Sequence, residues 1–253
     1  MDLTTRGGFF TRAFGTPPRE GEPTVVLVHG LGLSGRYFVP LARRLAAQGA
    51  SVLVPDLPGN ARSRGAAGRA PDITEHARAL AVWHRRLGLG PVVLVANSVG
   101  CQVAAALAAA HPDMVGRLVL AGPALDPAVP AWRQCALLVQ DAPREPLRLF
   151  ALAVSDYLVT GLLRCAAEYR HALRDAAGSF EANLAQIHVP TLVVRGEGDP
   201  LVSPSWTRRI TSLVDDGRTA EVPGAAHAAH YSAPDAMATL VRKFTADGPG
   251  GPA

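Results

Sequence analysis

Short apolar runs rich in β-branched residues alternate with helix-compatible segments along most of this 253-residue chain. The apolar runs occupy residues 25–28, 51–54, 92–95, 118–120 and 191–194, and a last strand-like run follows at 219–222. Their composition predicts strands that are buried on both faces. Helix-compatible segments occupy residues 37–48, 74–87, 98–111 and 204–214. This alternation predicts an α/β fold in which helices cover both faces of a mostly parallel sheet.

The alternation stops once, between residues 126 and 186, where prolines punctuate helix-compatible sequence and no strand-like run occurs. We interpret this block as a helical insertion over the sheet. We therefore predict one α/β-type core built from residues 1–125 and 187–247, a helical cap at 126–186, and a disordered tail rich in Gly and Pro at 248–253.

Composition and charge exclude several classes of protein. Hydrophobic residues make up 48% of the chain and charged residues 18%, which indicates a globular protein. The net charge is +4, but arginines such as Arg43, Arg85 and Arg208 are scattered and form no basic stripe interleaved with aromatic residues. We therefore expect no nucleic-acid partner.

The N-terminus and the cysteines bear on location and on metal binding. Residues 1–8 lack the apolar core of a signal peptide, and no apolar stretch is long enough to span a bilayer. We expect a cytoplasmic protein with no membrane partner. Cys101, Cys135 and Cys165 are odd in number and lack C-x-x-C spacing, which predicts free thiols and no metal site.

The strongest catalytic signal follows the run at 92–95, where the sequence reads Ala-Asn-Ser-Val-Gly from Ala96 to Gly100. Ligands bind beyond the carboxyl ends of parallel strands. A nucleophile on a sharp strand-to-helix turn needs a small residue two positions before it and another two positions after it. Ala96 and Gly100 meet this need around Ser98. The start of the next helix favours an oxyanion, with the Val99 N–H as donor. Ser98 is thus the candidate nucleophile; the alternative is a serine that only caps the helix.

A second glycine-rich bend follows the run at 25–28 and reads His-Gly-Leu-Gly from His29 to Gly32. Such a bend lets a backbone N–H approach the reacting centre, and we assign the Leu31 N–H as the second oxyanion donor. We interpret His29 as a buried histidine that braces this loop rather than as the catalytic base.

A serine nucleophile needs a base, and the imidazole of that base needs a carboxylate to fix its tautomer. Asp199 follows the run at 191–194 in a glycine-flanked loop, and we favour it over its rival Asp126. His227 is the first histidine after the last strand-like run, and we favour it as base over its rival His230.

These four motifs resemble those of the α/β-hydrolase superfamily over roughly residues 8–245. The resemblance implies a mostly parallel eight-stranded sheet with one antiparallel strand, a helical cap after the sixth strand, and no cofactor. The sequence departs from the common pattern at Ala96, where Gly is commoner, and at Cys101, where a second Gly is absent. The second departure weakens an assignment to the carbon–carbon bond hydrolases.

The predicted function is that of a serine hydrolase that cleaves an ester, lactone or thioester of a small to medium apolar molecule through an acyl-enzyme. Because fold and triad do not fix the reaction, a lyase, cyclase or acyltransferase of the same fold remains the alternative, and a ligand-binding module is a further one. Tyr37, Trp132 and Tyr157 are the candidate substrate-binding residues. We expect a small-molecule substrate and leave a homodimer open.

Overall fold

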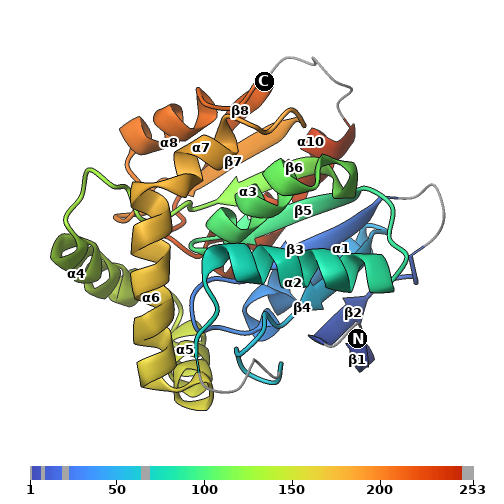
Figure 1. The fold of residues 1–253 in the computed structure, drawn as a ribbon, viewed down its shortest axis with the longest axis horizontal. Coiled ribbons are helices and arrows are strands. Elements are labelled where there is room, and N and C mark those ends of the chain that lie inside the picture. The colour runs from blue at the N-terminus through green and yellow to red at the C-terminus, as the bar shows by residue number, and fades with distance from the viewer. Residues whose placement is uncertain (1, 7–8, 19–22, 64–68, 247–253) are drawn as a thin grey trace.

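A single twisted sheet runs through the centre of the computed structural model, which describes residues 2–6, 9–18, 23–63 and 69–246 (Figure 1). The order of its eight strands is β1-β2-β4-β3-β5-β6-β7-β8. Their bounds are β1 Asp2–Arg6, β2 Phe9–Phe14, β3 Thr24–Val28, β4 Ser51–Pro55, β5 Val92–Asn97, β6 Val115–Ala121, β7 Thr191–Gly196 and β8 Gly217–Val222. Strand β2 is antiparallel to β1 and β4, and the other neighbouring strands are parallel. The α/β fold with a mostly parallel sheet is thus confirmed.

Helices cover both faces of the sheet. Alternate residues of one strand point to opposite faces, so Val26 of β3 belongs to the apolar cluster under α2 and α3, whereas Val25 belongs to the cluster under α1 and α10. The bounds of the helices outside the β6–β7 connection are α1 Val39–Ala47, α2 Ile73–Arg86, α3 Gly100–Ala110, α8 Pro204–Thr211, α9 Ala229–Ser232 and α10 Pro234–Ala246, with 3-10 turns η1 Gly35–Phe38 and η2 Pro112–Met114.

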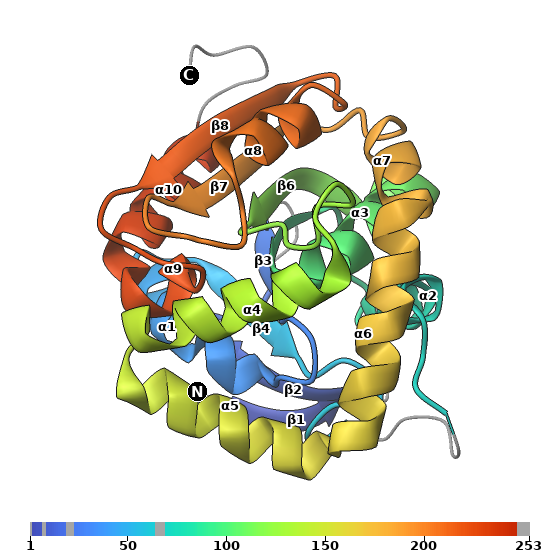
Figure 2. The same ribbon diagram turned by 90° about the vertical axis from the view of Figure 1, so that its left-hand side faces the viewer.

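Four helices connect β6 to β7: α4 Ala131–Asp141, α5 Leu147–Thr160, α6 Leu162–Ala177 and α7 Ser179–Leu184, with the 3-10 turn η3 Ala142–Arg144 after α4. Figure 2 shows α4, α5 and α6 on the side that faces the viewer, in front of the sheet. Helix α7 differs, because Phe180 and Leu184 are fully buried in the same cluster as α3. The predicted disordered tail, 248–253, lies outside the described residues.

A buried ion pair fixes the loop between β3 and α1. Asp56 follows β4 and is completely buried, and one of its carboxylate oxygens accepts hydrogen bonds from the Arg12 guanidinium of β2 at 2.5 Å and from the Gly35 N–H at 2.7 Å. Removing one partner of such a pair leaves an uncompensated buried charge, which is strongly destabilising. The pair therefore ties the start of η1, just after the Gly30–Leu31 bend, to two strands.

Candidate active site

The turn between β5 and α3 holds Ser98 in a rare backbone conformation. Its φ is +56°, in the left-handed region that non-glycine residues seldom adopt. The Ser98 N–H is anchored to the Ala121 carbonyl of β6 at 3.1 Å. A Cβ on Gly100 would lie 2.6 Å from the His29 carbonyl oxygen and 2.7 Å from that of Val28, so only glycine fits at this position. The chain can turn from β5 into α3 here because Gly100 permits this approach to β3.

The His29–Gly32 bend lies directly against this turn. A Cβ on Gly30 would lie 3.2 Å from Cβ of Ser98. The buried ring of His29 contacts its own loop through Nδ1, 2.8 Å from the Gly30 carbonyl oxygen, and its Nε2 accepts the Leu57 N–H at 2.8 Å. Burial lowers the pKa of His29, in keeping with a neutral ring. His29 thus braces the loop, as the sequence indicates.

Asp199 and His227 form a buried pair. His227 Nδ1 lies 2.9 Å from Asp199 Oδ2, while Asp199 Oδ1 accepts the N–H groups of Leu201 at 2.8 Å and Val202 at 3.2 Å. Burial acts to lower the pKa of His227, but the charge of Asp199 and the hydrogen bond to it outweigh burial and raise this pKa to about 9. Among the described residues, His227 Nε2 has no hydrogen-bond partner, so this atom is available to a substrate or nucleophile.

The rival residues of the sequence analysis lie in other surroundings. His230 is completely buried, and its ring packs 4.2 Å from that of Tyr37 and 4.3 Å from that of Phe38, measured between centroids. Burial holds the pKa of His230 well below its usual value, so this ring is a neutral core residue. Asp126 accepts the Ala128 N–H at 2.9 Å, which is the bond of a local turn.

Ser98 and His227 meet at one cavity of about 110 Å³. Leu31 and Val99, the predicted oxyanion donors, line the same cavity, as do the predicted substrate-binding residues Tyr37 and Tyr157. The remaining wall consists of Gly30, Leu33, Ala124, Leu125, Gln134, Cys135, Leu138, Tyr169 and Leu201. The structure thus brings together residues from the ends of β3, β5 and β8 and from the helices of the β6–β7 connection.

The third predicted substrate-binding residue, Trp132, lies away from the cavity, which differs from the prediction. Its side chain is 73% exposed on α4 and is not part of the cavity wall. Successive residues of a helix are rotated by about 100° around its axis. This rotation places Gln134, Cys135 and Leu138 on the side of α4 that lines the cavity and Trp132 on another side. Aromatic character alone did not distinguish the two faces of this helix.

Two carboxylates beside His227, the buried Asp141 and the half-buried Glu145, were missed by the sequence analysis. Asp141 accepts the His227 N–H at 3.3 Å, and Glu145 accepts the Ala228 N–H at 2.6 Å. Burial raises the pKa of both carboxyls. Both residues come from α4 and the turn after it, so no signal in the local sequence linked them to a histidine more than eighty residues away.

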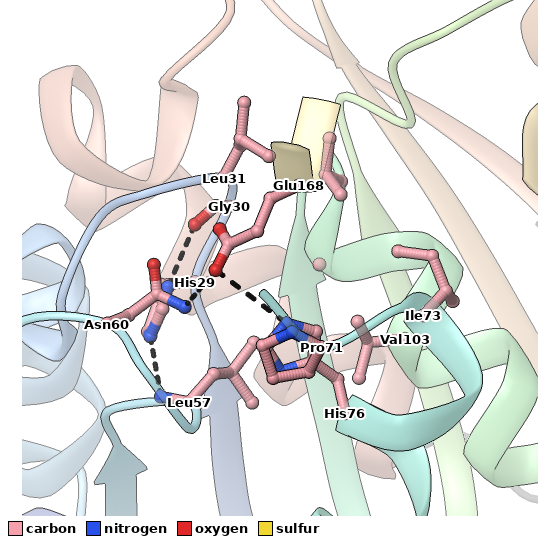
Figure 3. Close-up of a pocket in the computed structure, with 12 residues that line it drawn as sticks. His29, Gly30, Leu31, Leu57, Asn60, Pro71, Ile73, His76, Val103 and Glu168 are labelled. Atoms are coloured by element: carbon pink, nitrogen blue, oxygen red, sulfur yellow. Dashed lines mark hydrogen bonds and ion pairs between the residues drawn. The ribbon is translucent and has the colours of Figure 1, made fainter. Parts of the chain in front are cut away.

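A second polar cluster lies behind the Gly30–Leu31 bend (Figure 3). Glu168 of α6 accepts a hydrogen bond from the Asn60 amide at 3.2 Å and one from the Gly32 N–H, and it lies 4.0 Å from Nε2 of His76. Burial raises the pKa of Glu168 to about 7 and lowers that of His76 to about 3. Glu168 therefore connects the inserted helices to the bend that carries Leu31.

Neither this cluster nor the cysteines indicate a metal centre. In the ranges that the structure describes, no group of three or more His, Cys, Asp and Glu side chains is arranged to hold a metal ion. Cys101, Cys135 and Cys165 are free thiols, and Cys135 lines the cavity beside Ser98.

The raised pKa of Glu168 yields a prediction about stability. The Glu168 carboxyl binds its proton more tightly in the folded state than in the unfolded chain. Its contribution to the free energy of unfolding is therefore fully present below about pH 4.5 and is lost as pH rises through about 7. Glu168→Gln removes the charge and keeps an acceptor for Asn60 and Gly32. We expect this variant to match the parent at pH 4 and to exceed it at pH 8 by up to about 3 kcal/mol in urea unfolding.

Glu75→Gln is the opposite control for this measurement. In the parent, a hydrogen bond from Arg69 lowers the pKa of the Glu75 carboxyl to about 2, so the charged form of Glu75 stabilises the folded state. Glu75→Gln removes this charge and should lose stability relative to the parent at pH 8. A Glu168→Gln variant that is equally destabilised at pH 4 and pH 8 would contradict the proposed link between the raised pKa of Glu168 and the pH dependence of stability.

Comparison with known proteins identifies the family. The family described as serine aminopeptidase, S33, matches residues 19–232. A 2-hydroxy-6-oxononadienedioate/2-hydroxy-6-oxononatrienedioate hydrolase of Pseudomonas putida is 28% identical, with 89% of this chain and 88% of the relative covered.

Solved structures show the same fold. A thermophilic esterase from Thermogutta terrifontis superposes with a TM-score of 0.77 at 22% identity, over 94% of this chain and 93% of the esterase. An enol-lactonase from Burkholderia xenovorans LB400 gives 0.72 at 21% identity, over 97% and 100% of the two chains. The chain belongs to the serine aminopeptidase S33 family of the α/β-hydrolase superfamily.

Proposed function

We propose that this protein is a serine hydrolase that cleaves a carboxylic ester, lactone or thioester through an acyl-enzyme. The observation that carries the proposal is the meeting of Ser98, at φ +56°, with the paired His227 and Asp199 at one apolar cavity. The family places the chain among hydrolases, and the esterase and lactonase that share its fold agree with this chemistry.

The proposed reaction follows from the positions of these groups. Ser98 Oγ attacks the carbonyl carbon, and its proton passes to His227 Nε2 while Asp199 stabilises the imidazolium. The N–H groups of Leu31 and Val99 hold the oxyanion, each contributing about 3 kcal/mol to the transition state. The protonated His227 then protonates the leaving group, and the same ring later activates the water that releases the acid.

The alternatives differ in the fate of the substrate at the same cavity. A lyase or cyclase of this fold would convert its substrate in the cavity without hydrolysing it to an acid. An acyltransferase would pass the acyl group to an acceptor other than water. A ligand-binding module would hold the molecule unchanged. The paired His227 and Asp199 favour chemistry over binding, because a binding module needs no oriented base.

We further propose that the substrate is uncharged around its reacting bond and has an apolar acyl or alcohol part. The cavity wall contains no Arg or Lys side chain among its described lining residues, and its aliphatic and tyrosine side chains suit an apolar group. The carboxyls of Asp141 and Glu145 lie beside His227 and, after Asp199, act to raise its pKa. A carboxylate on the substrate would therefore find no Arg or Lys partner in the wall and would lie near the carboxyls of Asp141 and Glu145.

Ser98→Ala tests the nucleophile. We expect it to abolish both turnover of a nitrophenyl ester and labelling by a fluorophosphonate, with a loss of several orders of magnitude because triad members act as a unit. Ser205→Ala, at an exposed serine on α8, is the matched control and should keep both signals. Labelling that persists in Ser98→Ala, with the fold intact by circular dichroism, would refute the proposal.

The acid is tested by comparing Asp199→Asn with Asp126→Asn on one activated ester. We expect a loss of up to about ten-thousandfold in kcat for Asp199→Asn, because the imidazolium loses its stabilising charge, and little loss for Asp126→Asn. In the parent, kcat/KM should rise with pH up to about 9, the pKa of His227. In Asp199→Asn this rise should occur at lower pH, because the charge that raises the pKa of His227 is lost. A severe defect in Asp126→Asn alone would reassign the acid.

Substrate charge is tested with two nitrophenyl esters of equal chain length, one ending in a methyl group and one in a carboxylate. We expect kcat/KM to be at least about tenfold higher for the neutral ester, and Glu145→Gln to narrow this ratio. Because the ratio compares two substrates on one enzyme, a change in the pKa of His227 cancels. Glu197→Gln, at an exposed glutamate, should leave the ratio unchanged, and a parent enzyme that prefers the carboxylate would disprove this specificity.

A further inference from the structure

The outer surface of α4, α5 and α6 holds nearly all of the large apolar side chains that the described chain exposes. Eleven such residues are exposed, and only Val82, on α2, lies outside residues 132–163. Leu163 is 89% exposed, Leu147 86% and Val139 74%. We call the following ten residues the apolar face: Trp132, Leu138, Val139, Leu147, Phe150, Val154, Leu158, Val159, Leu162 and Leu163.

The apolar face follows the pattern of an amphipathic helix along α5. Leu147, Phe150, Val154 and Leu158 recur every three or four residues, which places them in one stripe. The opposite side of α5 buries Asp156, which accepts hydrogen bonds from Ser34 at 2.7 Å and from Arg36 at 2.6 Å. The inward side of α5 also packs Leu149 into the apolar cluster under α1 and α10, so the outward stripe is apolar surface that the packing of α5 leaves uncovered. Ten large apolar side chains exposed on three consecutive helices, in a chain whose described residues expose only one elsewhere, indicate an interaction site.

Charge on this surface has a single sign. The structure describes every residue from 126 to 177, and none of the six acidic side chains in this segment is exposed. They are Asp126, Asp141, Glu145, Asp156, Glu168 and Asp175. Five arginines of the same segment are exposed: Arg133, Arg144, Arg148, Arg170 and Arg174. The apolar face thus lies among positive charges with no exposed negative charge between them.

We propose that the apolar face docks this protein on an anionic lipid surface. Apolar side chains surrounded by arginines match the two attractions of such a surface, burial at the acyl boundary and charge attraction to the headgroups. A second copy of this chain fits less well, because symmetric contact would bring the exposed arginines of both copies together without acidic partners.

The mode of binding is peripheral. Within the described ranges no single helix is long and apolar enough to cross a membrane. Helices α5 and α6 reach the required length and composition only as a pair bent by 98° at their junction, so neither forms a straight span, and we place their apolar face in the interface. The expectation of no membrane partner was based on the lack of a spanning stretch, which does not exclude a helix that lies in the interface.

The apolar face also borders the candidate active site. Leu138 is 49% exposed and at the same time lines the cavity beside Ser98. A bound lipid surface would therefore adjoin the cavity, so that an apolar substrate could pass into it from the lipid. The docking itself does not depend on the proposed reaction, because it uses residues outside the Ser98–His227–Asp199 arrangement.

Sedimentation with vesicles tests the docking. The whole chain is mixed with vesicles of phosphatidylcholine alone or of phosphatidylcholine and phosphatidylglycerol in equal parts. We expect the bound fraction to be several-fold higher on the mixed vesicles and to fall as salt is raised, because salt screens the arginines. Ser98→Ala should bind like the parent, which separates this test from the test of catalysis.

Two double variants assign the binding to this face. Leu147→Ser with Leu163→Ser should lower binding to the mixed vesicles at least several-fold, and Arg148→Glu with Arg170→Glu should remove the preference for them. Arg78→Glu with Val82→Ser makes the same kinds of change at exposed positions on α2 and should bind like the parent. Circular dichroism confirms that each variant is folded.

Three outcomes would overturn the proposal. The first is a parent protein that binds neither kind of vesicle. The second is equal loss of binding in the α2 control. The third is a dimer in light scattering that the two leucine substitutions dissociate, without any vesicle binding, which would assign the apolar face to a second copy of the chain.

Discussion

The close approach of α3 to β3 at Gly100 is the constraint on which the candidate site depends. Because Gly100 has no side chain, the carbonyl oxygens of His29 and Val28 can lie 2.6 and 2.7 Å from the place where a Cβ would be. This contact brings the loop after β3 against the turn after β5, so Leu31, Ser98 and Val99 line one cavity. A larger residue at this position would separate the two loops and, with them, the two proposed oxyanion donors.

The inserted helices complete the site from two sides. Glu168 and Thr160 bind the Gly32 N–H and carbonyl groups, so α5 and α6 hold the bend that carries Leu31. Asp141 and Glu145 bind the backbone of the His227 loop in the same way. The connection between β6 and β7 therefore positions the loops of the candidate site as well as covering them, and we expect substitutions within it to affect the proposed reaction without touching substrate.

The sequence predicted the parts of the fold and site that depend on local patterns. Continuous apolar runs marked the buried parallel strands, and small residues marked the turn at Ser98, because both are set by neighbours in the chain. The first two strands, β1 and β2, carry no such run and were not identified individually from the residues. Asp141, Glu145 and Glu168 were missed because their roles arise from contacts between distant segments. Trp132 was misassigned because periodicity on α4 was not used to separate its inner and outer faces.

The segregation of charge in residues 126–177 links substrate choice to the surface on which the protein is proposed to act. The acidic side chains of this segment are buried or half-buried, and two of them, Asp141 and Glu145, add to the effect of Asp199 in raising the pKa of His227; we propose that they also oppose an anionic substrate. Arginines are turned outward, where they attract an anion. An anionic lipid headgroup would thus be held outside while an uncharged chain enters past Leu138. Carboxylates exposed among these arginines would weaken the proposed docking, since they would repel anionic headgroups.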